Sequence, residues 1–270
     1  MITAEQKAHF ETFGFLFLRQ ALSQDEINDV IREAEEVMKT ERGGRPRAQE
    51  EEQSVAPFVE LSPKLSPLAE DDRIYGTVEQ LFGPDLIWAG SEANVTVDSV
   101  TDWHADRHGE SQLGYDRVKV MLYLDTVTAD HGALRVIPGS HRMPLYMDLD
   151  VQMVELRQDP QAQPFGVEGS DLPGFPLESN PGDVVFFNHN LYHAVYNGWA
   201  GRRYIALKYA ENPRSPEDVD KLTELASGVF NVHDSFLNSQ SPRIRGMVDR
   251  LMAAAPKGRS RAPRCSVNER

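Results

Sequence analysis

The stretch of the sequence with the clearest chemical potential places an imidazole and a carboxylate two residues apart. His104 and Asp106 lie in the segment Trp103-His104-Ala105-Asp106. At the end of a β-strand, side chains two residues apart point to the same side, so both could bind one ion. His193 supplies a third candidate ligand. Two histidines and one carboxylate that leave further positions of the ion open are typical of non-haem Fe(II) oxygenases.

Two other histidines stand close to these ligands in the sequence. His189 lies four residues before His193 and would share its side of a straight strand, so it competes for the third ligand position. His108 follows Asp106 by two residues and could extend the same strand face, line a pocket or lie in solvent. The residue types alone leave this choice open.

A pair of arginines follows His193 and could bind an anion beside the metal. Arg202 and Arg203 are adjacent, so their side chains would point to opposite sides of a strand. A guanidinium binds a carboxylate through two parallel hydrogen bonds and stays charged at any relevant pH. Tyr204 would share the side of Arg202.

The elements that must position these residues change character along the chain. Residues 1–85 favour helices, with Thr3 and Ser23 as expected N-caps and a further helix over 70–82. Residues 86–210 hold short strand-like runs separated by turn signals, which is typical of an antiparallel jelly roll. Residues 211–254 favour helices again. The expected strands are Phe13–Leu18, Leu86–Trp88, Ala93–Val97, Val118–Leu124, Ala133–Ile137, Asp183–Phe187 and Arg203–Tyr209.

Three segments do not fit this pattern of helices and strands. Residues 40–54 are polar and charged, and we expect a mobile loop there. Residues 143–178 are rich in Pro, Gln, Asp and Gly and too long for a plain turn, which favours a functional lid. The basic tail 255–270 is expected to be disordered. The sequence therefore predicts a single domain over 1–254, mainly β with flanking helices.

Composition limits the classes of partner and the compartment. The formal net charge of −14 argues against nucleic acid as a partner, because phosphate binding requires clustered Lys and Arg. No apolar run approaches the roughly 18 residues of a membrane span, and the N-terminus lacks the pattern of a signal peptide. Cys265 is the single cysteine, which fits a reducing cytoplasm. The sequence sets no expectation for the oligomeric state.

Four sequence blocks together resemble the phytanoyl-CoA dioxygenase family of Fe(II)- and 2-oxoglutarate-dependent oxygenases. One of them is the His104–Asp106 motif, and the resemblance covers about residues 1–210. The blocks are Phe10–Leu16, Trp103–Asp106, Leu124–Asp125 with His131–Arg142, and Pro181–Phe187 with His193, Asn197 and Arg202. The His104–Asp106 motif alone is a weak signal, whereas all four blocks in order and at plausible spacing are a strong one.

The resemblance implies a double-stranded β-helix (a cupin-like jelly roll) that binds Fe(II), 2-oxoglutarate and O2. It implies His104, Asp106 and His193 as the metal ligands, because the family spacing selects His193 over His189. It also implies Arg202, rather than Arg203, as the partner of the distal carboxylate of 2-oxoglutarate. A lining position of the family's cosubstrate pocket falls on Met121, although core packing explains a methionine there equally well. Lys119 and Tyr123 share the strand face of Met121 and are further candidates for the pocket.

The chain departs from the family pattern directly after the distal histidine. The family often has Gly-Ser there, whereas this chain has Ala194-Val195, so a hydroxyl that commonly contacts the cosubstrate is missing. Tyr204 could supply a hydroxyl in its place. Some relatives replace the metal carboxylate by Ala or Gly and bind halide, so the presence of Asp106 favours hydroxylation over halogenation.

These observations predict a dioxygenase that hydroxylates a small-molecule substrate and releases succinate and CO2. Two alternatives stay open at this point. The same cofactors could support desaturation, epoxidation, cyclisation, or C–P or C–N oxidation. A cupin-like protein could instead bind a metal for sensing, without turnover, although such a protein has no need for a carboxylate-binding arginine.

Overall fold

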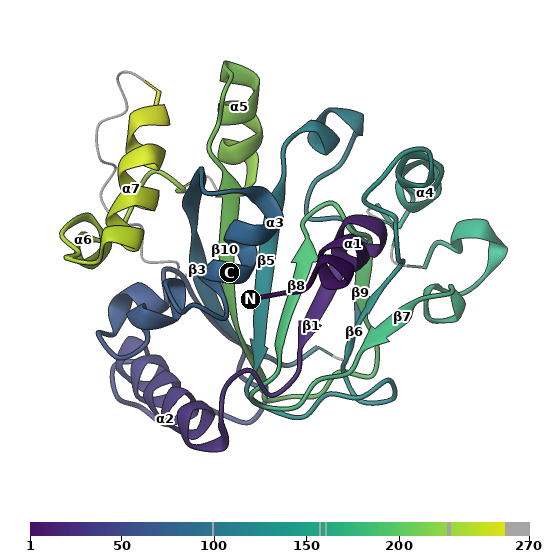
Figure 1. The fold of residues 1–270 in the computed structure, drawn as a ribbon. Coiled ribbons are helices and arrows are strands. Elements are labelled where there is room, and N and C mark those ends of the chain that lie inside the picture. The colour runs from purple at the N-terminus through teal and green to yellow at the C-terminus, as the bar shows by residue number, and fades with distance from the viewer. Residues whose placement is uncertain (99, 157, 160, 226–227, 257–270) are drawn as a thin grey trace.

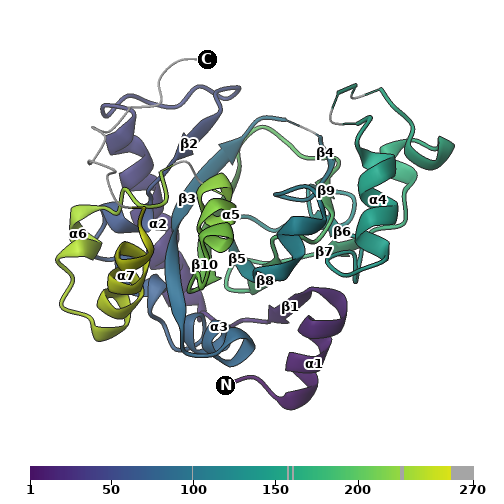
Figure 2. The same cartoon turned by 90° about the horizontal axis from the view of Figure 1, so that it is seen from above.

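Two antiparallel sheets face each other in the computed structural model, which describes residues 1–98, 100–156, 158–159, 161–225 and 228–256 (Figures 1 and 2). The larger sheet has the order β1 (Phe15–Leu18), β8 (Val184–Asn188), β5 (Arg117–Tyr123), β10 (Arg202–Glu211), β3 (Leu86–Thr96) and β2 (Gln53–Val55). The smaller sheet has the order β4 (Thr101–His104), β9 (His193–Val195), β6 (Leu134–Val136) and β7 (Phe175–Leu177). This arrangement confirms the predicted jelly roll.

Most helices pack outside the sheets, as Figure 2 shows. On the outer side of the larger sheet lie α1 (Ala4–Phe13), α2 (Gln24–Glu41), α3 (Tyr75–Phe82), α6 (Asp234–Leu237) and α7 (Pro242–Ala254). Helix α5 (Pro216–Leu225) packs instead against Ile87, Ala89 and Ala210 on the other face of this sheet, at its end. The predicted caps are confirmed, because Thr3 and Ser23 each form a complete capping box with the residue three positions on. Within the described residues, no helix combines the length and apolarity that crossing a bilayer would require.

Short 3-10 turns connect these elements at Val59–Leu61, Ser66–Ala69, Glu110–Gly114, Pro164–Gly166 and Gly169–Asp171.

The two largest of four apolar clusters among the described residues explain why the sheets lie where they do. The outer core lies between the larger sheet and the helices, where Ile27 of α2 and Met247 of α7 are fully buried. The inner core lies between the sheets and includes Phe187 of β8, Met121 of β5 and Val136 of β6. Alternate residues of the larger sheet's strands lie in one core or the other, because successive side chains of a strand point to opposite faces.

Several predicted boundaries were wrong for identifiable reasons. The predicted runs Leu86–Trp88 and Ala93–Val97 form one strand, β3, which continues through Gly90 at φ 110°, beside an irregularity in its pairing with β10. The predicted helix 70–82 begins only at Tyr75. The three-residue strands β2, β7 and β9 were not predicted, because so short a run carries no clear alternation.

The predicted loop 40–54 is organised by arginines. Helix α2 extends to Glu41, and β2 begins at Gln53. Between them, Arg45 forms an ion pair with Glu51, and the guanidinium of Arg47 donates to three backbone carbonyls of its own turn. The predicted tail is described only to residue 256, so that prediction concerns residues outside the described part.

The segment 143–178 packs behind the smaller sheet. It contains helix α4 (Leu145–Met153), which was not predicted, and it shares a buried cluster with Trp103 and Ala194 from the outward side of β4 and β9. Trp103 is 1% exposed, and its indole N–H donates to the carbonyl of Gly169 over 2.7 Å. The segment thus supports the strands that carry the histidines from their outer face. The expected role of this segment as a lid stays a prediction.

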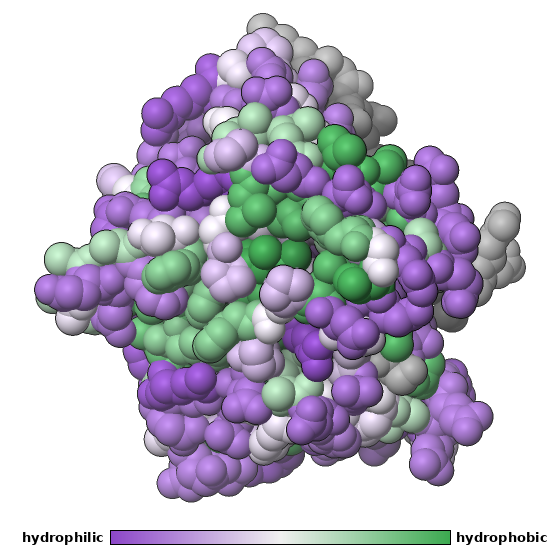
Figure 3. Space-filling model, turned by 90° about the vertical axis from the view of Figure 1, so that its right-hand side faces the viewer, coloured by the Kyte–Doolittle hydropathy of each residue, from purple (hydrophilic) through white to green (hydrophobic). Residues whose placement is uncertain are grey.

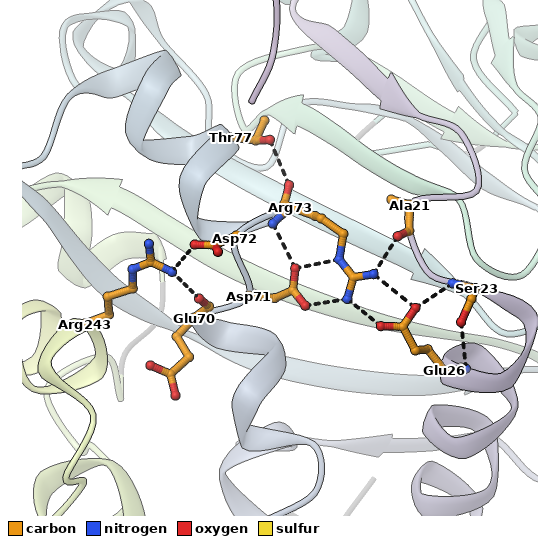
Figure 4. A network of polar contacts seen from close by, with 9 residues as sticks. All are labelled: Ala21, Ser23, Glu26, Glu70, Asp71, Asp72, Arg73, Thr77 and Arg243. Carbon is orange, nitrogen blue, oxygen red and sulfur yellow. Dashed lines mark hydrogen bonds and ion pairs between the residues drawn. The ribbon is translucent and has the colours of Figure 1, made fainter.

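A polar network joins the helices on the side of the larger sheet (Figure 4). The guanidinium of Arg73 binds Asp71 over 2.6 Å and Glu26, at the start of α2, over 2.9 Å. Arg243 of α7 reaches Asp72 over 2.6 Å. These contacts connect α2 and α7 through the segment before α3, at a distance from the histidines, so they stabilise the scaffold rather than the candidate site.

One face of the molecule carries an apolar patch. Figure 3 shows this face, which is formed by the side of the molecule that holds α1, α4 and β7. Exposed apolar side chains on these elements are Phe13, Leu145 and Phe175. Phe175 also stacks on Phe15 with ring centroids 5.4 Å apart, so the patch continues into the inner core.

The packing of Trp103 generates a stability prediction. Trp103→Ala should lower the free energy of unfolding by about 3–5 kcal/mol, because it removes a fully buried ring and leaves the Gly169 carbonyl without its donor. Urea unfolding measures the change through its midpoint. Phe165→Ala is the matched control, since this aromatic residue lies in the segment that Trp103 packs against but is 53% exposed. It should change stability by less than about 0.5 kcal/mol; equal losses would contradict the supporting role of Trp103.

Candidate metal centre

The pairing of β4 with β9 brings the two predicted histidine ligands face to face. His104 is the register partner of His193, and their ring centroids are 4.2 Å apart. Asp106 lies just past the end of β4, where its backbone N–H donates to the carbonyl of His189 over 3.2 Å. One possible ligand atom from each of His104, Asp106 and His193 lies within 4.8 Å of the others. The structure thus brings the predicted triad together.

The hydrogen bonds of the two imidazoles fix which ring nitrogen is available. Nδ1 of His104 lies 2.7 Å from the carbonyl of Asp102, and Nδ1 of His193 lies 2.8 Å from the carbonyl of Leu191. A carbonyl can only accept, so Nδ1 carries the proton in each ring and Nε2 keeps its lone pair. Nε2 of His193 lies 3.8 Å from Oδ1 of Asp106. Two free imidazole nitrogens and one carboxylate oxygen are a donor set that fits Fe(II).

Charges around Asp106 keep it in the ionised form that binds metals. Burial by itself would raise its pKa, but Lys119 and the contacting His189 together hold the pKa well below its usual range. The Lys119 ammonium lies 3.4 Å from Oδ2 of Asp106 and 3.9 Å from Glu92. Glu92 in turn pairs with Lys208. Opposite charges therefore alternate along the inner face of the larger sheet.

The buried histidines are neutral at physiological pH. Burial, assisted by the nearby His104, lowers the pKa of His193 to about 3, and burial lowers the pKa of His189 to about 4. Neutral imidazole is the form that binds a metal, so His193 needs no deprotonation near pH 7.

His189 is buried beside the triad but is not part of the cluster of ligand atoms. The straight strand that would have aligned it with His193 does not form, because β8 ends at Asn188 and β9 begins at His193. Its Nδ1 instead lies 3.0 Å from Oδ2 of Asp106. His108 is 40% exposed and lies near Asp150, so it does not extend the strand face.

A cavity of about 110 Å³ adjoins the triad and contains the other predicted site residues. Arg202, Met121, Tyr204, Lys119 and Tyr123 all line it, together with the histidines His104 and His193. Met121 also belongs to the inner core, so both of its expected roles hold at once. None of the lining residues comes from segment 143–178.

Arg202 and Arg203 differ sharply in their surroundings. Arg202 is 4% exposed and donates to the carbonyl of Gly132 over 2.8 Å, and no carboxylate of the described residues lies within ion-pair distance of it. Arg203 points to the other face of β10, where it pairs with Asp125 over 2.6 Å and with Glu35. A buried guanidinium without a counter-charge is costly, so the cavity suits an anionic ligand at Arg202.

Sequence reasoning missed Thr101, Leu134 and Phe187, which also line the cavity. The alternation of β8 could have indicated Phe187, because it shares a face with Val185 of the inner core. Thr101 gives no such signal, because the pairing register shifts between Thr101 and His104. That irregularity lets residues three positions apart line the same cavity.

Val195 stands where the family serine would be, and it lines the cavity without a hydroxyl.

Comparisons with known proteins agree with this fold and site. A family model described as phytanoyl-CoA dioxygenase (PhyH) matches residues 10–197. The dioxygenase lolE1 of Epichloe uncinata is 28% identical over 140 residues, which is 52% of this chain and 48% of that protein. The ectoine dioxygenase of Bordetella bronchiseptica is 24% identical over 71% of this chain and 69% of its own length. The chain thus spans about half the length of one relative and about two thirds of the other.

Among solved structures, HygX from Streptomyces hygroscopicus, with nickel and 2-oxoglutarate bound, matches with a TM-score of 0.63 at 22% identity. The match covers 78% of this chain and 87% of that one. At this level of identity, the likeness supports the jelly-roll fold.

The cluster of ligand atoms predicts selective loss of metal binding. His104→Ala, Asp106→Ala and His193→Ala should each weaken Fe(II) binding by more than about 100-fold, beyond the 10- to 100-fold loss that is typical of an outer-shell partner. Anaerobic isothermal titration measures the affinity. His131→Ala is the control, because this exposed histidine stacks on Trp199 and lies outside the cluster. Wild-type affinity in any of the three triad variants would remove that residue from the ligand set.

Proposed function

The chain belongs to the phytanoyl-CoA dioxygenase family of Fe(II)- and 2-oxoglutarate-dependent oxygenases, and we propose that it hydroxylates a small-molecule substrate with release of succinate and CO2. The observation that carries this proposal is the combination of the His104–Asp106–His193 cluster with the buried Arg202 in one cavity. Either feature alone has ordinary explanations, whereas both together meet the needs of a metal and of a carboxylate.

In this proposal each residue of the site has a distinct task. His104, Asp106 and His193 hold the iron, two through Nε2 and one through a carboxylate oxygen. When bound, the iron supplies O2 activation coupled to the oxidative decarboxylation of 2-oxoglutarate. Lys119 keeps Asp106 ionised at neutral pH. The apolar walls of the cavity, such as Phe187 and Leu134, exclude water from the reacting groups.

Arg202 binds the distal carboxylate of 2-oxoglutarate. Its guanidinium lacks a counter-charge within the described residues and lies in the cavity that also holds the metal ligands. The cavity of about 110 Å³ suits a small dicarboxylate and leaves no room for a bulky second molecule. The organic substrate therefore lies mainly outside this cavity, at the open side of the metal.

The substrate class follows from the relatives rather than from the cavity. The matched relatives include an ectoine dioxygenase and a 2-aminoethylphosphonate dioxygenase, whose names specify small polar molecules. Hydroxylation fits the metal carboxylate Asp106, and the other oxidative outcomes differ from it only in how the substrate is placed. A metal-binding protein without turnover would gain nothing from the uncompensated charge of Arg202.

The pair of adjacent arginines provides the test of this function. Arg202→Met should weaken 2-oxoglutarate binding by at least about 30-fold, since losing one partner of a buried charge pair costs about 2–5 kcal/mol. Arg203→Met should leave this binding unchanged, because that side chain pairs with Asp125 on the opposite face. Anaerobic titration of the Fe(II) protein, followed by the visible absorption of the chelated cosubstrate, gives both affinities. Succinate release then reports turnover. Equal effects of the two substitutions would exclude Arg202 as the clamp.

Tyr204 provides a second test that concerns the missing family hydroxyl. Burial raises the pKa of Tyr204 to about 12, so its phenol stays a hydrogen-bond donor throughout the range of assay. Tyr204→Phe should weaken 2-oxoglutarate binding by roughly 10- to 100-fold, equally at pH 6 and pH 9, because a hydrogen bond from a neutral phenol to the anionic cosubstrate is lost. An unchanged affinity would show that the cavity manages without a hydroxyl at this position. The measurement is the same anaerobic titration.

A further inference from the structure

His189 is a deeply buried titratable group beside the metal cluster that the proposed mechanism leaves without a task. It lies in the turn between β8 and β9 and is 1% exposed. Its Nδ1 lies 3.0 Å from Oδ2 of Asp106, but this close approach is not aligned as a hydrogen bond. Both ring nitrogens of His189 and Oδ2 of Asp106 therefore lack a hydrogen-bond partner within the described part of the chain. Burying these polar atoms unsatisfied carries a cost, which a small rotation that turns the Nδ1–H toward Oδ2 removes.

The backbone of His189 is fixed on both sides of this contact. Its carbonyl accepts from the N–H of Asp106 over 3.2 Å, and its own N–H donates to the carbonyl of Arg117 over 3.1 Å. His189 and Asp106 are therefore joined twice, once through the backbone and once through the side chains. This double connection sets the position of the imidazole relative to the carboxylate.

We propose that His189 is a positioning residue that holds Oδ2 of Asp106, so that Oδ1 faces Nε2 of His193, which lies 3.8 Å away. The inference rests on the proposed function, since it assigns the geometry of the same metal centre. Nδ1 carries the proton, because it faces an ionised carboxylate that can only accept. A carboxylate held in this way offers one oxygen to the ion, which leaves more of the ion's positions open for the cosubstrate and O2.

Lys119 cannot perform this task, although it contacts the same carboxylate. Its Nζ lies 3.4 Å from Oδ2 and 3.5 Å from Oδ1 of Asp106, so it does not distinguish the two oxygens. An ammonium is a compact point charge with rotatable donors, whereas an imidazole N–H has one fixed direction. Lys119 thus keeps Asp106 ionised, and His189 sets the rotation of the Asp106 carboxylate group.

Three substitutions of His189 separate positioning from packing. His189→Leu removes the donor, His189→Asn places an amide N–H near the position of Nδ1, and His189→Gln places its donor farther out, near the position of Nε2. Co(II) is the probe, because its visible absorption reports both binding and coordination. We expect His189→Leu and His189→Gln to weaken Co(II) binding by about 10- to 100-fold, the range for outer-shell partners, and His189→Asn to restore most of it. The Co(II) spectrum should change in the first two variants and return toward the wild type in the third.

His141→Leu is the matched control. This half-buried histidine also has an Nδ1 without a hydrogen-bond partner in the described residues, and it packs against Gly14 rather than the triad. It should lower the thermal midpoint while leaving Co(II) affinity within about twofold of the wild type. The control measures the effect of losing a buried imidazole as such.

The outcomes distinguish this inference from the proposed function. If the wild type binds Co(II) and all His189 variants bind it equally well with unchanged spectra, the positioning role is overturned and the metal centre stands. If the wild type binds neither Co(II) nor Fe(II), the proposed function itself fails. If His189→Leu does not fold, the comparison of Asn with Gln decides, and equal affinities of these two overturn the inference.

Discussion

The cross-strand register that sets His104 opposite His193 is the constraint on which the rest of the site depends. A slip of one residue would turn every side chain of a strand to the other face. Trp103 would then enter the cavity, and Ala194 would replace His193. The register is held from both sides, because Trp103 is anchored on the outer segment at Gly169 while Val195 packs in the inner core. The metal centre is thus a consequence of packing on two faces of a very short pair of strands.

The second requirement is electrostatic, since the inner face of the larger sheet buries several charges. Each buried ion costs several kcal/mol unless an opposite charge lies close by. Lys208, Glu92, Lys119 and Asp106 satisfy this by alternating in sign from one neighbour to the next. Arg202 is the exception on the same face, because among the described residues it has a carbonyl, a hydroxyl and the ring of Tyr204 as partners and no carboxylate. The one place where the alternation fails is the place where an anion is expected to bind.

The sequence could predict those parts of the site that follow from period-two alternation, and it failed where tertiary contacts override it. The geometry of a strand was enough to predict that Arg202 and Arg203 point to opposite faces, and the structure confirms it. Helix α4 could not be predicted, because contacts behind the smaller sheet stabilise it rather than a local pattern. The position of Thr101 depends on a register irregularity, and that of His189 on a turn that breaks the expected straight strand. Both features arise from how two strands meet, which a single strand's pattern does not encode.

The charges of the site also indicate an order of binding. Three cations (Lys119, Lys208 and Arg202) and two carboxylates (Glu92 and Asp106) face the cavity or its neighbours, so these five residues sum to +1 although the whole chain carries −14. A divalent ion at the triad raises this sum to +3. Coulomb attraction for a dicarboxylate is therefore much stronger after the ion has bound, especially where burial reduces screening. The two negative charges of the dicarboxylate then offset the two charges of the ion. The charge of the residues around the cavity is positive, whereas the net charge of the whole chain is negative. The acidic chain therefore does not prevent a small dianion from binding in the cavity.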